Sequence, residues 1–91
     1  YNKAIALDPN LVEAYIGRGA VFEKKSQYDK AIENYNKAVQ LNPNFALAYN
    51  NRGIAYANKG QYDRAKSDLQ KACDMGYKNG CKNLHKVLKN R

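Results

Sequence analysis

The sequence predicts an all-α fold in which antiparallel helix pairs stack on one another as a solenoid. The chain matches itself at a shift of 34 residues, and self-similarity at this period indicates a stacked repeat. Within each period, apolar residues recur at helical spacing, and no segment has the alternation of a strand. The matching positions include Ala14 and Ala48, Tyr15 and Tyr49, Gly19 and Gly53, Tyr28 and Tyr62, and Ala31 and Ala65.

The first eleven residues belong to the same register. Residues 1–11 read YNKAIALDPNL and residues 35–45 read YNKAVQLNPNF, with seven of the eleven positions identical. We therefore interpret the opening stretch as the second helix of a repeat whose first helix lies outside the given sequence. Its residues should be helical, should pack on the helix that follows, and should leave an apolar flank open. Asp8-Pro9 would end it.

Each full period contains two predicted helices, at 11–25 and 28–41, and then at 45–59 and 62–75. Asn42-Pro43 ends the second helix, because a residue before proline avoids the α region. Gly60 can adopt the left-handed conformation that ends the third. The 91 residues suffice for one small domain, which we divide into a partial repeat at 1–11, repeats at 12–45 and 46–79, and a capping helix at 80–91.

Small and large residues alternate at the predicted helix crossings. Gly19 and Gly53 would allow two helices to approach closely, and alanines on the second helices would do the same. Tyrosines would fill the space beside them, because they recur at helical spacing on the apolar faces. They are Tyr15, Tyr28, Tyr35, Tyr49, Tyr56 and Tyr62. We expect these aromatic residues to belong to the core.

The same residues resemble the pattern of the tetratricopeptide repeat (TPR) family. One match is formed by Tyr15, Gly19, Phe22, Tyr28, Ala31, Tyr35, Ala38 and Pro43, and a second by Tyr49, Gly53, Tyr56, Tyr62, Ala65, Leu69 and Ala72. The resemblance covers residues 1 to about 76. It implies a right-handed α-α superhelix whose first helices line a concave groove, and it implies that this groove binds a peptide or a partner protein.

The register of the resemblance assigns groove positions to the first helix of each pair. They are Glu13, Ile16, Gly17, Ala20, Glu23 and Lys24, then Leu47, Asn50, Asn51, Ile54, Ala57 and Asn58. Asparagine amides can bond both backbone groups of an extended peptide, although each position could also be ordinary solvated surface. Chaperone-binding members of the family hold the terminal carboxylate of a ligand with a clamp of Lys, Asn and Arg side chains. Asn51 matches the middle Asn of that clamp. Ile16 and Ala20 replace the first Lys and Asn, which argues against a clamp.

The second repeat departs from the pattern at its end, where Met75 to Cys81 contain no proline. The segment ACDMGYKNGCKNL resembles Sel1-like repeats, in which two cysteines are often separated by seven residues across a helical turn. Cys73 and Cys81 have this spacing. They form either a disulfide or two buried thiols. A bonded pair would indicate a periplasmic or secreted protein, and a reduced pair a cytoplasmic one. The compartment stays open.

Residues 79–90 predict an amphipathic helix with Leu84, Val87 and Leu88 on one side and lysines on the other. The chain carries a net charge of +8, and about half of this excess lies in residues 80–91. A basic end could contact nucleic acid, an acidic protein or an anionic membrane, but a solvated cap explains it equally. Because the aromatic residues are assigned to the core, we expect no nucleic-acid partner, and the sequence has no membrane-spanning run.

The sequence offers no arrangement typical of an enzyme. Ser26 lies far along the chain from the single histidine, His85, and Ser67 lies on a helix face. No phosphate-binding loop or carboxylate pair is present. Cys73, Cys81 and His85 are too few for a zinc site, so we expect neither a metal nor a cofactor.

Two functional hypotheses follow from these observations. The first is a non-enzymatic scaffold that binds a peptide or partner protein in the groove of the superhelix. The alternative is a structural module that self-associates weakly, head to tail, through its incomplete terminal helices.

Overall fold

The computed structural model describes residues 9–90, and the prediction for the first eight residues lies outside this range. Five helices follow one another: α2 (Pro9–Lys24), α3 (Tyr28–Leu41), α4 (Ala46–Asn58), α5 (Tyr62–Asp74) and α6 (Lys78–Asn90). The described residues contain helices and turns and no strand, so the all-α prediction is confirmed. Predicted and observed helix ends differ by up to two residues. Pro9 begins α2, where its missing N–H costs no hydrogen bond.

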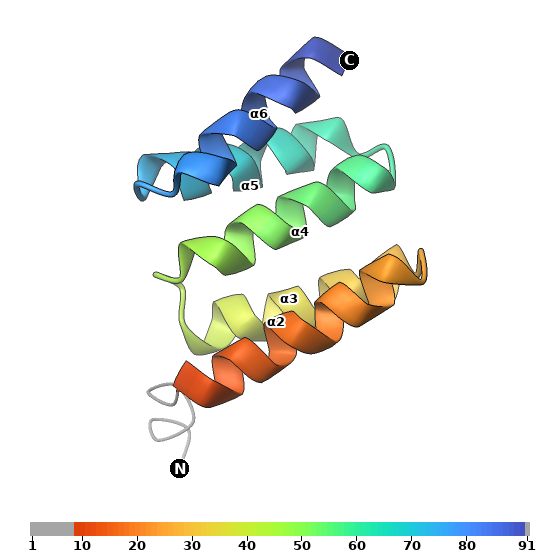
Figure 1. Cartoon of the computed structure of the whole chain (residues 1–91), viewed down its shortest axis with the longest axis vertical. Helices are drawn as coiled ribbons and strands as arrows, with labels where there is room; N and C mark the ends of the chain where they lie inside the picture. The colour runs from red at the N-terminus through yellow and green to blue at the C-terminus, as the bar shows by residue number, and fades with distance from the viewer. Residues whose placement is uncertain (1–8, 91) are drawn as a thin grey trace.

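The helices are stacked along the long axis of the molecule, whose extents are 43 × 29 × 16 Å (Figure 1). Helices α2 and α3 form one pair at one end, α4 and α5 form the next, and α6 packs on α5 at the other end. This arrangement is the helical-repeat solenoid that the sequence predicts.

Two kinds of connection join the helices. The turns after α2, α4 and α5 each place one residue in the left-handed region: Ser26 (φ 61°), Gly60 (φ 86°) and Gly76 (φ 93°). In each turn the next backbone N–H reaches back to a carbonyl five residues earlier, at 2.9 to 3.0 Å. The α3–α4 connection contains Pro43 instead. The α5–α6 connection therefore repeats the turn used inside a pair, which explains why it needs no proline.

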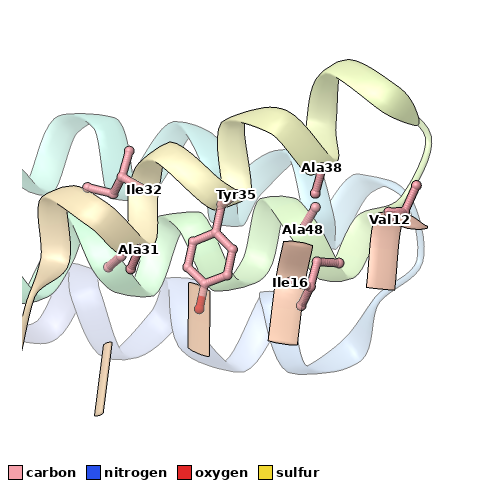
Figure 2. Packing of buried hydrophobic residues seen from close by; sticks show 8 residues of the cluster. Val12, Ile16, Ala31, Ile32, Tyr35, Ala38 and Ala48 are labelled. Atoms are coloured by element: carbon pink, nitrogen blue, oxygen red, sulfur yellow. The ribbon is translucent and has the colours of Figure 1, made fainter. Parts of the chain in front are cut away.

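The main core lies between α2, α3 and α4 (Figure 2). It consists of Val12, Ile16, Ala31, Ile32, Tyr35, Ala38, Ala48 and Ala55. Gly19 faces the ring of Tyr35 so closely that an added Cβ would lie 2.5 Å from Cε1. An added Cβ at Gly53 would lie 2.8 Å from Leu69 Cγ. Both glycines thus have the close-approach role predicted for them. Tyr62 is a correction to the predicted core, because it is 37% exposed at the start of α5.

A disulfide, apolar packing and a hydrogen bond attach helix α6 to the second pair. A disulfide joins Cys73 on α5 to Cys81 on α6, with their Cα atoms 4.6 Å apart. Val87 is buried in a smaller cluster with Ala65 and Leu69. Asn83 Nδ2 also donates a 2.9 Å hydrogen bond to Asn50 Oδ1 on α4. Helix α6 therefore covers the α4–α5 pair, as expected of a cap.

Candidate functional site

The structure brings five of the twelve predicted groove residues together around one open pocket of about 340 Å³. Ala20, Glu23 and Lys24 come from the second half of α2, and Asn51 and Asn58 come from α4. Two neighbouring first helices thus supply one wall each. Below the pocket lies the fully buried side chain of Tyr35, on α3.

The other predicted groove residues lie elsewhere. Ile16 is a correction, because it is only 6% exposed and belongs to the main core. Asn50 is a second correction: it is 4% exposed and bonded to Asn51 and Asn83, so α6 covers it. Leu47 packs against the main core, whereas Ile54 and Ala57 pack against the cluster below α6. Glu13 and Gly17 are exposed outside the pocket.

Side chains from two other helices hold the carboxylate of Glu23 in place. The Tyr35 hydroxyl on α3 donates to Glu23 Oε1 at 2.8 Å, and Asn58 Nδ2 on α4 donates to Oε2 at 3.2 Å. Burial raises the pKa of Glu23, although both hydrogen bonds oppose the shift because they favour the charged form. Burial and the adjacent carboxylate raise the pKa of the Tyr35 hydroxyl, which stays a donor. The result is a fixed, partly desolvated carboxylate.

Glu23 has no cationic partner within residues 9–90. The ion pairs there join Arg52 to Asp68, Lys59 to Asp29, and Lys66 to Asp63. Lys24 lines the same pocket, but its side chain is exposed and forms no ion pair with a described residue. The pocket therefore has one immobilised negative charge and one exposed positive charge at its edge.

A second pocket of about 220 Å³ lies beside the buried ion pair of Arg52. The Arg52 guanidinium donates to both oxygens of Asp68, at 2.7 and 2.8 Å, and to Asn36 Oδ1 at 3.0 Å. The hydrogen bonds to Asp68 raise the pKa of Arg52, so it stays charged. These contacts link α3, α4 and α5, and the donor sites they occupy are not available to a ligand. We interpret this pocket as a by-product of a structural bridge.

Sequence reasoning missed the polar role of Tyr35. Helical spacing places its ring in the core, and the ring is buried there, but the hydroxyl extends far enough to meet Glu23. A signal was available: a phenol on a packed face needs a hydrogen-bond partner, and Glu23 lies at the end of the preceding helix facing it.

Two further classes of site find no support in the described range. Residues 9–90 contain no group of three or more His, Cys, Asp or Glu side chains arranged to hold a metal ion. None of the described helices has the length and apolar character that crossing a membrane requires.

The comparisons with known proteins agree with this architecture. Models of the tetratricopeptide repeat match residues 1–33 and 46–75, and a model described as TPR repeat matches residues 24–60. The chain belongs to the tetratricopeptide repeat family, whose members are generally protein-interaction modules without enzymatic activity. The Sel1-like character of the C-terminal end stays a prediction. None of the curated proteins matches the chain.

Among solved structures, the chain is similar to two crystal structures of MamA. One is 39% identical with a TM-score of 0.68, over 79% of this chain and 39% of that one. The other is 38% identical with a TM-score of 0.70, over 84% of this chain and 44% of that one. The chain thus spans about two fifths of the length of these structures.

Proposed function

We propose that this protein-interaction module binds a peptide or a segment of a partner protein across α2 and α4. The main support is the open pocket, which collects five residues that the repeat register had assigned to the groove. They come from segments about 30 residues apart in the chain. If the two helices form a groove, their groove residues should line one hollow together, as these five do. Unrelated surface positions would be scattered over the molecule.

The chemistry of the pocket suits an extended peptide. The amides of Asn51 and Asn58 can each donate to a carbonyl and accept from an N–H. Ala20 leaves space between the two helices, and the main core below holds both walls in place. A peptide here would meet preformed polar groups on a rigid support, which lowers the entropic cost of binding.

Selection from a displayed peptide library, followed by titration of the selected peptide, tests the proposal. Asn51→Ala and Asn58→Ala should each weaken binding by about tenfold, since each removes one amide from the pocket. Gln40→Ala, an exposed amide on α3, is the matched control and should bind like the wild type. Peptides that bind all three variants equally would place the site elsewhere.

Head-to-tail association is the second candidate, and two exposed apolar side chains favour it. Val21 on α2 and Leu88 on α6 are each 52% exposed. Helices α2 and α6 lie at opposite ends of the stack (Figure 1). One period on from Val21 is Ala55, which is fully buried, and one period before Leu88 is Ile54, which packs below α6. Val21 and Leu88 therefore occupy positions whose counterparts on α4 are covered by a neighbouring helix. A second copy could cover both.

Light scattering over a concentration series tests this association. The wild type should gain mass with concentration, and Leu88→Lys should stay monomeric, because a charge on the proposed contact opposes burial. A wild-type chain that is monomeric at the highest concentration rules this candidate out.

A further inference from the structure

The charge of the pocket indicates what kind of peptide it would select. We propose that the pocket takes a Lys or Arg side chain of the bound peptide, with the Glu23 carboxylate as its counter-ion. This inference rests on the groove binding proposed above and specifies its ligand.

The Glu23 carboxylate can accept more hydrogen bonds than the fold gives it. A carboxylate has about four lone-pair sites, and the hydrogen bonds from Tyr35 and Asn58 use one on each oxygen. The remaining sites belong to a group that lines an open pocket. An ammonium or guanidinium group supplies only donors, and a guanidinium can approach a carboxylate with two parallel N–H groups.

The Glu23 carboxylate is also held in place before any ligand binds. Tyr35 and Asn58 hold the carboxylate from two different helices, so little side-chain freedom is left to lose when a ligand binds. The ring of Tyr35 is itself fully buried and packs closely against Gly19. An incoming cation therefore meets a carboxylate that is already placed and already partly stripped of water. Charge-assisted hydrogen bonds are strongest under these conditions.

The Glu23 carboxylate has no counter-ion within residues 9–90. A partly buried carboxylate without a cation is destabilised by desolvation, as the raised pKa of Glu23 records. Residues 9–90 supply no ion pair to it, although the same residues pair Asp68 and Asp29 with basic side chains. A basic ligand side chain would provide the charge that the fold itself does not.

The net charge of +8 does not prevent a basic side chain from binding at the Glu23 pocket, because much of the positive charge lies elsewhere. Four of the lysines, at positions 78, 82, 86 and 89, lie on α6, at the far end of the stack from α2 (Figure 1). Charges in solution are screened over about 8 Å at physiological ionic strength. Lys24 is the cation that lines the pocket, and its exposed side chain can turn toward solvent or toward an acidic or carbonyl group of the ligand.

The test uses two small probes of nearly the same shape, one cationic and one neutral: acetyl-Gly-Arg-Gly-amide, and the same peptide with citrulline, whose ureido group replaces the guanidinium. Each is titrated into the ¹⁵N-labelled chain while the backbone amide of Ala20 and the side-chain amides of Asn51 and Asn58 are followed. The arginine probe should bind about tenfold more tightly than the citrulline probe, which corresponds to one charge-assisted hydrogen bond. Its binding should weaken with added salt, and it should weaken as the pH falls through the raised pKa of Glu23.

Two variants on the same helix separate the pocket from general charge. Glu23→Gln should abolish the preference for arginine, whereas Glu13→Gln removes an equal charge outside the pocket and should preserve it. Thermal melting of each variant confirms that it is folded. Equal binding of both probes by the wild type, an arginine preference that survives Glu23→Gln, or no shift with either probe each overturns the inference.

The library selection separates this inference from the function on which it rests. Selected peptides that lack Lys and Arg but still depend on Asn58 would leave groove binding standing and remove the basic specificity. Selected peptides that are indifferent to the groove variants would remove groove binding itself.

Discussion

Replacing Gly19 with alanine tests how tightly α2 and α3 approach each other below the candidate pocket. The added Cβ would lie 2.5 Å from Tyr35 Cε1 and 2.9 Å from Cδ1 and Cζ, closer than real Cβ contacts allow. The ring is fully buried and its hydroxyl is bonded to Glu23, so it cannot move aside without losing packing or that bond. Overpacking of this kind costs about 1–3 kcal/mol, and the better helix propensity of alanine returns about 1 kcal/mol. We expect a net loss of up to about 2 kcal/mol in the free energy of unfolding.

Gly17→Ala is the matched control on the same helix. Gly17 is exposed and an added Cβ would meet nothing within 4 Å, so only the propensity gain of about 1 kcal/mol remains. Urea or thermal unfolding measures both variants, and each 1 kcal/mol corresponds to about 4–8 °C in melting temperature for a domain of this size. Melting temperatures that rise equally in the two variants would refute the close approach.

Three further predictions concern the turns and the links between helices. Ser26→Gly should stabilise the chain by about 1 kcal/mol in urea unfolding, because Ser26 has φ 61° and glycine adopts this region without strain; a loss of stability would contradict the turn. The Cys73–Cys81 disulfide should appear as a mass difference of two hydrogens on reduction, and reduction should lower stability by about 2–3 kcal/mol; two free thiols after oxidising purification would contradict it. Arg52→Ala should lower the free energy of unfolding by about 3–5 kcal/mol, since it leaves a buried carboxylate unpaired. Arg18→Ala, its exposed counterpart one repeat earlier, should lower it by at most about 1 kcal/mol, and equal losses would refute the bridge.

The repeat period was sufficient to predict the helices, because close packing at Gly19 and Gly53 and the recurring alanines leave a marked pattern in the sequence. Turn chemistry was only partly visible. Gly60 predicts a residue in the left-handed conformation. Ser26 has the same conformation, but a serine does not predict it. The turn at Gly76 could be placed from its glycine, but its likeness to the turns inside each pair required the backbone hydrogen bonds.

For the candidate site, the sequence predicts the direction in which side chains leave their helices but not how far neighbouring helices bury them. The repeat register states which way a side chain leaves its helix, and Ala20, Glu23 and Asn58, which it assigns to the groove, line one hollow in the structure. It does not state how much of that side a neighbouring helix covers. Ile16 is covered by the main core and Asn50 by α6, and both depend on distances between helices that the period does not encode.

The most direct test of groove binding is the NMR footprint of a library-selected peptide on the ¹⁵N-labelled chain. We expect the largest shifts on the pocket residues of α2 and α4, led by Ala20, Asn51 and Asn58, and we expect Asn58→Ala to need about tenfold more peptide to give the same shifts at Ala20 and Asn51. Shifts that are confined to α5 and the lysines of α6, and that appear at the same peptide concentration in this variant, would contradict groove binding.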